Sequence, residues 1–247
     1  MKKLIITSLF ATCFVMNNVN AQENYSNIED FKDGTILVFQ NCDTDTFEID
    51  NVGKNVIWDY SNLKNLDETT TQWIVSPKGI NEAKDYPEAT LVEKYSDGKY
   101  VFLKADKNKT YLLGFVDEKS KIKIKYPQPV LIANRPFSYN EKISETYTTS
   151  YTVSGMDFSG KGTVTIEADG FGTLILPNKT YTNTLRIKIT QNQTDTLKQY
   201  NSISNTTLVT YVWFDTIHTS ALLKMTETKS QYHSEKSIQY LLSETQK

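Results

Sequence analysis

Two runs of alternating apolar and polar residues, joined by a Pro-Asn pair, constrain the fold of this chain most strongly. The runs occupy residues 173–176 (TLIL) and 184–189 (TLRIKI), with Pro177 and Asn178 in the segment between them. Their β-branched residues and alternating polarity favour pleated, half-buried strands over a helix. Pro177 presets the first corner of a turn and Asn178 tolerates the second. We therefore predict an antiparallel hairpin across residues 170–189.

The rest of the chain carries similar signals. Asp97-Gly98 separates two β-rich runs, which is the strongest short-range signal for a hairpin. Aromatic residues make up 12% of the chain, and helical periodicity is nearly absent, with one helical turn expected at residues 81–85. We predict an all-β fold, an antiparallel β-sandwich-like arrangement of one large or two small sheet domains.

A cluster of prolines indicates an internal boundary. Pro127, Pro129 and Pro136 disfavour both a helix and a central strand around them. We predict an N-terminal β region, a meander, over residues 22–128 and a C-terminal β-sandwich-like region over residues 129–247. A crossover between two sheets of a single sandwich fits the same prolines.

The first 21 residues have the features of a cleaved secretory signal peptide. Lys2 and Lys3 precede a largely apolar stretch at residues 4–16, and Ala21 ends a cleavage-type sequence. The apolar stretch is too short to span a membrane. We predict a mature chain that begins near Gln22 and is exported to the periplasm, the cell surface or the medium, without a transmembrane segment.

The charge and cysteine content of the mature chain narrow its partners. Without Lys2 and Lys3, 25 of the 27 cationic residues remain against 29 acidic ones, a net charge of −4. This balance gives no reason to expect binding to nucleic acid. Cys42 is the one cysteine of the mature chain, so an internal disulfide is excluded and stability must come from the core.

Three patches of the sequence resemble a group of known proteins. The patches are GFGTL…LPNKTYTNTLR at residues 170–186, WDYSNL at 58–63 and LVTYVWF at 208–214. They resemble blocks in uncharacterised secreted bacterial β-proteins that often precede a C-terminal secretion-sorting module. Those proteins usually have glycine after the Pro-Asn pair, where this chain has Lys179. The resemblance implies a β architecture and export, and it carries no activity.

Two groups of residues are candidates for a binding site. Acidic side chains crowd the segment after residue 42, at Asp43, Asp45, Glu48 and Asp50, but their spacing does not match a helix-loop-helix calcium loop. We interpret them as a solvated hairpin end, with an irregular calcium site as the alternative. Trp58 is interpreted as a core anchor, with a sugar-stacking surface as the alternative. A cleft lined by exposed Trp58, Trp73 or Trp213 would favour that alternative.

Two sets of cationic residues have structural and functional readings. Arg186 is one of only two arginines; we favour an ion pair with an acid on a neighbouring strand over a carboxylate-binding clamp. Lys121, Lys123 and Lys125 alternate with apolar residues, so they should share one strand face. We interpret that face as a solvated guard against edge pairing rather than a site for an acidic polymer.

The chain contains no recognisable catalytic constellation. His218 and His233 are its only histidines, and neither a zinc motif nor a Gly-x-Ser-x-Gly elbow occurs. We therefore predict no catalytic residue, no metal site and no cofactor. The predicted function is that of an exported, non-catalytic binding or structural protein at the cell envelope, with an envelope protein or a polysaccharide as partner. The alternatives are a carbohydrate-binding or calcium-dependent adhesive module, and a glycoside-hydrolase-like enzyme with carboxylates assembled across strands.

Overall fold

The computed structural model describes residues 24–49, 51–153, 155–231 and 233–246. The predicted signal peptide, residues 1–21, lies outside the described residues. One short 3-10 helix, η1, and thirteen strands form the described fold, and the strands belong to a single sheet. Their bounds are β1 Thr35–Cys42, β2 Gly53–Asp59, β3 Asn65–Val75, η1 Asn81–Asp85, β4 Leu91–Tyr95, β5 Lys99–Ala105, β6 Lys109–Asp117, β7 Ile122–Asn134, β8 Lys142–Val153, β9 Met156–Ile175, β10 Thr180–Leu197, β11 Ser202–Phe214, β12 Leu223–Ser230 and β13 Ser234–Gln246.

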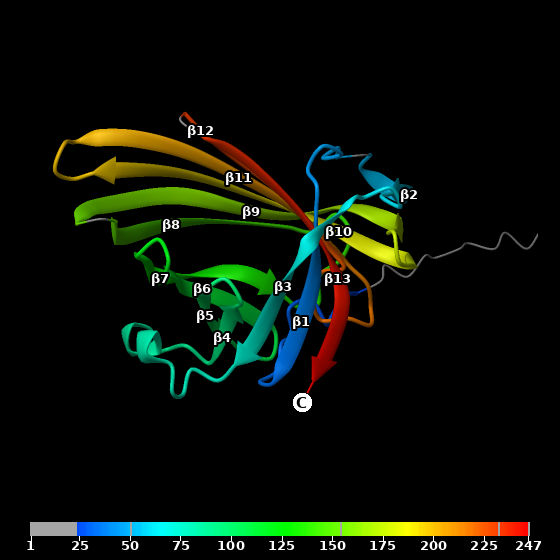
Figure 1. Cartoon of the computed structure of the whole chain (residues 1–247), viewed down its shortest axis with the longest axis horizontal. Coiled ribbons are helices and arrows are strands. Elements are labelled where there is room, and N and C mark those ends of the chain that lie inside the picture. The colour runs from blue at the N-terminus through cyan, green and yellow to red at the C-terminus, as the bar shows by residue number, and fades with distance from the viewer. Residues whose placement is uncertain (1–23, 50, 154, 232, 247) are drawn as a thin grey trace, which may run out of the picture.

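Twelve of these strands close into an antiparallel barrel (Figure 1). Within the barrel, strands that follow one another in the chain pair antiparallel, and β1 pairs with β3 because β2 lies outside the ring. The ring closes because β13 pairs with β1 and β9 pairs with β10. The all-β prediction is confirmed, but the sandwich prediction is wrong. Alternating polarity shows that one face of each strand is buried, and it does not distinguish a sheet closed on itself from two packed sheets.

The two hairpins predicted from turn residues are confirmed. β4 and β5 flank Asp97-Gly98, where Gly98 has φ of 88°. β9 and β10 flank the Pro177–Asn178 turn, which Leu176 and Lys179 close through backbone hydrogen bonds. The left-handed residue in this region is Asn183, with φ of 53°, at a register shift between Tyr181 and Thr184. Lys179 occupies the position where the similar proteins usually have glycine, but its φ is not positive. The lysine therefore causes no backbone strain in this turn.

The short strand β2 is the exception to the antiparallel pattern. It runs parallel to the C-terminal half of β9 and extends the sheet at that end. The two backbones approach closely at Gly172, where an added Cβ would lie 1.9 Å from the carbonyl oxygen of Val56. Trp58 of β2 also lies against Gly170. Glycine at these two positions of β9 thus allows β2 to dock.

Apolar side chains cover both faces of β10 near its beginning. Leu185 belongs to a cluster inside the barrel with Ile166 and Val212. The residue after it, Arg186, points to the opposite face and lies at a second cluster, which contains Trp58 and Trp213. Near its end, at residues 192–197, most side chains of β10 are partly or fully exposed. The exposed polar side chains of β10 are therefore concentrated toward the end that leads to β11.

A third cluster lies over the outer face of β4–β6, where Tyr86 stacks on Phe102. The helical turn expected at residues 81–85 is present as η1 beside this cluster.

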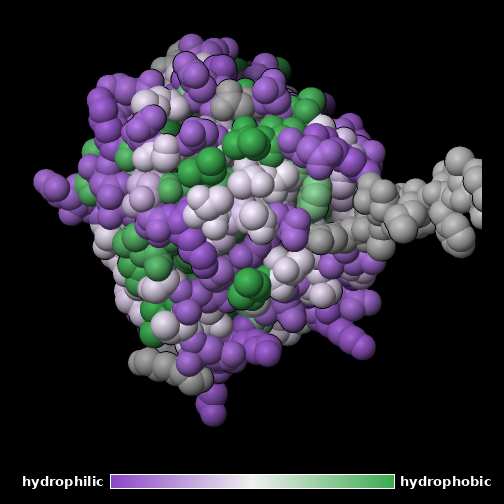
Figure 2. Space-filling view, turned by 90° about the vertical axis from the view of Figure 1, so that its right-hand side faces the viewer, coloured by the Kyte–Doolittle hydropathy of each residue, from purple (hydrophilic) through white to green (hydrophobic). Residues whose placement is uncertain are grey.

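The boundary predicted at residue 128 falls within β7, and the division into two regions stays a prediction. In the part of the chain that is described, no helix has the length and apolar character needed to cross a membrane. The face seen in Figure 2 is mainly polar, with apolar side chains in several small groups.

Candidate functional site

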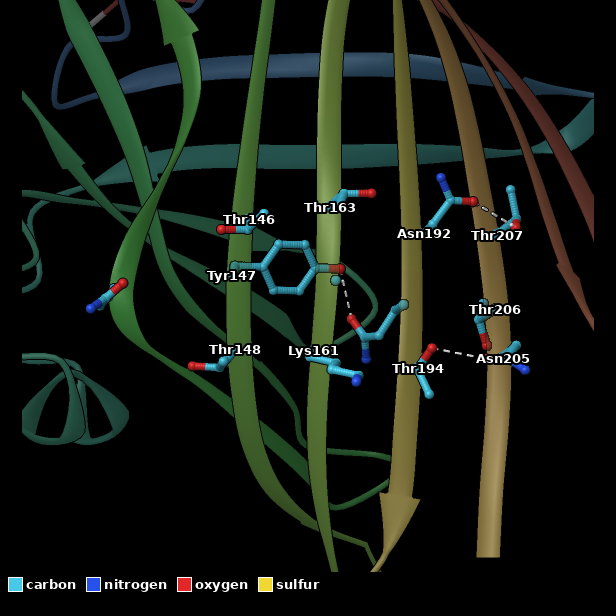
Figure 3. Close-up of a pocket in the computed structure, with 13 residues that line it drawn as sticks. Thr146, Tyr147, Thr148, Lys161, Thr163, Asn192, Thr194, Asn205, Thr206 and Thr207 are labelled. Atoms are coloured by element: carbon cyan, nitrogen blue, oxygen red, sulfur yellow. Dashed lines mark hydrogen bonds between the residues drawn. The ribbon is translucent and has the colours of Figure 1, made fainter.

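An open groove of about 650 Å³ lies over the outer face of β8–β11 (Figure 3). Side chains from four neighbouring strands line it at the same height, and Gln128 of β7 borders it. Most of the outward-facing lining carries a hydroxyl or an amide. The outward-facing residues are Thr146, Thr148, Lys161, Thr163, Asn192, Thr194, Asn205 and Thr207.

Strand periodicity and cross-strand pairing produce this polar surface. Alternate residues of a strand point to the same face, so the register of β8–β11 brings the threonines and asparagines together. The Thr207 hydroxyl donates to Asn192 Oδ1 at 2.9 Å, and the Thr194 hydroxyl donates to Asn205 Oδ1 at 2.8 Å. These bonds orient both amides on an exposed surface, with the NH₂ groups left for other acceptors.

Behind the groove, a hydrogen-bonded network lies on the inner face of the same strands. The hydroxyl of Tyr147 donates to Gln193 Oε1 at 2.9 Å and accepts a bond from Gln191 Nε2 at 2.5 Å. Gln193 Nε2 in turn lies 2.9 Å from each carboxylate oxygen of Asp195. Burial raises the pKa of Tyr147, so the phenol stays protonated and can donate. Tyr147 and Asp195 are both buried.

Two glycines of β9 make room for this network. An added Cβ at Gly162 would lie 2.5 Å from the ring and hydroxyl of Tyr147. At Gly160 it would lie 2.2 Å from the Thr149 hydroxyl and 2.5 Å from Asp195 Oδ1. All these distances are shorter than non-bonded atoms allow. Glycine at residue 162 therefore lets Tyr147 cross β9 toward β10 (Figure 3), and glycine at residue 160 leaves room for Thr149 and Asp195.

Trp58 is a core residue, as predicted, and Trp213 is buried with it. Trp58 and Trp213 are fully buried, with ring centroids 6.0 Å apart in an edge-to-face arrangement. Trp73 is half-buried on β3 and does not line the groove. Trp58 and Trp213 therefore cannot form the exposed sugar-stacking surface that was the alternative reading.

Arg186 occupies the structural role that the sequence favoured. Its side chain is fully buried, and Nε lies 2.8 Å and Nη2 3.2 Å from the two carboxylate oxygens of Asp169 on β9. The guanidinium carbon also lies 5.4 Å from the ring centroids of Trp58 and of Tyr211. A guanidinium enclosed in this way is not presented to a ligand on the surface.

The acidic segment after β1 does not assemble a metal centre in the described residues. Asp43 Oδ1 accepts a hydrogen bond from the backbone N–H of Asp45 at 2.9 Å, which is a local turn contact. Asp50 lies outside the described residues. Across the described ranges, no group of three or more His, Cys, Asp or Glu side chains is placed to hold a metal ion.

The predicted lysine row is only partly formed. Lys123 and Lys125 point outward from β7, as predicted, and both pair with Asp85 of η1, Lys125 at 3.1 Å. These contacts lower the pKa of the Asp85 carboxyl, the hydrogen bond from Lys123 most. Lys121 lies in the turn before β7 with φ of 56°, so it does not share the strand face as predicted. The interpretation as a guard against edge pairing is wrong, because β7 pairs with both β6 and β8 at Lys123 and Lys125, and these two lysines hold η1 instead.

Two titratable groups away from the groove have raised pKa values. His218 Nδ1 lies 2.9 Å from Asp215 Oδ2, and this hydrogen bond raises the pKa of the imidazole. Inside the barrel, burial and the nearby charge of Glu93 raise the pKa of Glu29 to about 7. The cavity that Glu29 lines has a volume of about 20 Å³ and is otherwise mainly apolar, so it has room for a water molecule and not for a sugar ring.

Sequence reasoning missed the groove and the network behind it. A partial signal exists, because residues 162–168 alternate threonine with β-branched apolar residues. It indicates a strand with a hydroxyl-bearing outer face, and it cannot show that three similar strands lie beside it. No protein-family model, curated protein or solved structure matches the chain.

Proposed function

We propose that this chain is an exported, non-catalytic binding protein of the bacterial cell envelope, and that its groove over β8–β11 binds a polyhydroxylated polymer such as a polysaccharide. The signal-type sequence at residues 1–21 and the resemblance to secreted β-proteins support export. The groove itself supports the binding role.

The observation that carries the proposal is the run of oriented hydroxyl and amide groups along the groove. Such groups donate and accept hydrogen bonds at once, which suits ligands rich in hydroxyls. The groove is open and crosses four strands, so it fits an extended chain better than a compact molecule. Apart from Lys161, its outward-facing side chains are hydroxyls and amides, which are neutral hydrogen-bonding groups and suit binding rather than proton transfer.

The expected affinity is modest. Each hydrogen bond contributes a net free energy of about 1 kcal/mol, because the ligand and the protein both leave water. Four such bonds would correspond to a dissociation constant of about 1 mM for one segment of the polymer. Repeated contacts along a polymer raise the apparent affinity, so long chains should bind better than short oligosaccharides.

The test uses the mature chain, residues 22–247, in affinity electrophoresis and thermal melting with a panel of neutral polysaccharides. We expect at least one to retard the protein, and we expect the double substitution Asn192→Ala and Asn205→Ala to weaken binding about tenfold or more. The matched control is Thr210→Ala with Thr226→Ala, which removes a hydrogen-bonded polar pair, 3.3 Å apart, from the inner face of β11 and β12.

Two outcomes would contradict the proposal. Binding that is equally strong in the Asn192/Asn205 variant would place the polysaccharide site elsewhere. Failure of every polysaccharide to bind would leave the groove as an ordinary solvated sheet face. A calcium-dependent shift in melting temperature, abolished by Asp43→Ala with Asp45→Ala, would instead favour the calcium-dependent adhesive alternative.

A further inference from the structure

The inner face of β10–β12 has a hollow of its own, on the side of the strands opposite to the outward-facing side chains of the groove. Its volume is about 250 Å³, and Gln191, Gln193, Thr206, Leu208 and Thr228 line it. Because the volume is below the usual range for drug-sized ligands, the hollow fits one small ring and not a polymer.

The strand register places these side chains on the interior side. Gln191 pairs with Leu208, and Leu208 pairs with Thr228, so the three share one face across β10, β11 and β12. The same face of β10 carries Ile187, four residues earlier, in the apolar cluster inside the barrel. The hollow therefore lies where the inner wall changes from apolar to polar.

The polar groups of this wall are already held in place. Gln191 and Gln193 are fixed through the hydroxyl of Tyr147, and Gln193 is fixed again by Asp195. Preorganised donors and acceptors lose little freedom when a ligand binds.

Several hydroxyls around the network remain unused in the described residues. Thr206 and Thr228 line the hollow and make no side-chain hydrogen bond there. The buried Thr149 hydroxyl, which has no partner in the described part of the chain, lies on β8 and does not line the hollow. The two threonine hydroxyls of the hollow are partly exposed, so they can donate to or accept from a ligand.

We infer that this inner hollow is a second binding site, and that it takes one small, neutral, polyhydroxylated molecule of monosaccharide size. The amides of Gln191 and Gln193 and the two threonine hydroxyls supply hydrogen-bond donors and acceptors for the hydroxyl groups of such a ring. Leu208 offers an apolar surface for the C–H face of the ring. The site stands independently of the proposed function, because it lies on the opposite face of the strands.

The experiment is isothermal titration calorimetry and thermal melting of the mature chain with D-glucose, D-galactose, D-mannose and N-acetyl-D-glucosamine, one at a time. L-glucose serves as a control for non-specific stabilisation by a sugar solution. We expect saturable binding of at least one D-sugar and none of L-glucose. Equal, non-saturating shifts with D- and L-glucose and no saturable binding of any sugar would overturn the inference.

Substitutions locate the site. Leu208→Trp should fill the hollow and abolish binding, while Val209→Trp, the next residue on the outer face, should keep it. Thr228→Ala is a milder change that should weaken binding roughly fivefold, the equivalent of one hydrogen bond. Sugar binding that survives both Leu208→Trp and Thr228→Ala would refute the assignment. The Asn192/Asn205 variant should bind the sugar normally, so failure of one site does not decide the other.

Discussion

The buried ion pair between Arg186 and Asp169 gives the sharpest test of how the two faces of β10 are stabilised. We predict that Asp169→Ala destabilises the protein severely, because it removes a carboxylate that contacts the guanidinium through both oxygens. Arg186 is fully buried and the Asp169 side chain is 11% exposed, so water cannot replace the lost partner well.

The magnitude follows from the burial of the pair. Removing one partner of a buried ion pair costs about 3–5 kcal/mol. Because the aromatic rings of Trp58, Trp213 and Tyr211 still face the guanidinium, we expect the lower end, about 3 kcal/mol. For a chain of this size, each kcal/mol lowers Tm by about 2–4 °C, so Tm should fall by about 6–12 °C.

The assay is urea unfolding of the mature chain followed by tryptophan fluorescence, with thermal melting in parallel. Glu167→Ala is the matched control, because Glu167 lies on the same strand and pairs with Lys142 at 3.3 Å on an exposed surface. Exposed pairs contribute about 0–1 kcal/mol, so this variant should be nearly as stable as the wild type. Equal losses of free energy of unfolding in the two variants would refute the reasoning.

Two further predictions concern β2 and the interior. Gly172→Ala should lower the free energy of unfolding by about 1–3 kcal/mol and speed hydrogen exchange in β2, because the added Cβ would meet the Val56 backbone. Thr173→Ala is the control. Wild-type exchange rates in the Gly172→Ala variant would contradict the docking argument. Glu29 has a folded-state pKa of about 7, above its usual 4.5, so the native state binds more protons than the unfolded state between these values. Stability should therefore fall as pH rises through this window, by up to about 3 kcal/mol, and Glu29→Gln should flatten the curve of urea midpoint against pH; an unchanged slope would show that another group is responsible.

The local elements were predictable because their signals are local. Asp97-Gly98 and Pro177-Asn178 specify turns through backbone preferences of the residues themselves, and both hairpins formed. Alternation around residues 162–168 and 184–189 placed apolar side chains on one face of each strand. The core position of Trp58 and the ion pair of Arg186 also followed from general burial and pairing rules.

Three features depended on tertiary structure: the closure of the barrel, the outer groove over β8–β11 and the inner hollow of β10–β12. The pairing of β1 with β13 joins residues about 200 positions apart, and no local preference encodes such a partner. The groove needs Thr163, Asn192 and Thr207 side by side, and the inner network needs Tyr147 to cross Gly162. The sequence alone determined which residues favour strands, turns and burial, because those preferences act over a few residues. Only the three-dimensional register decided which side chains meet, because pairing between distant strands fixes their neighbours.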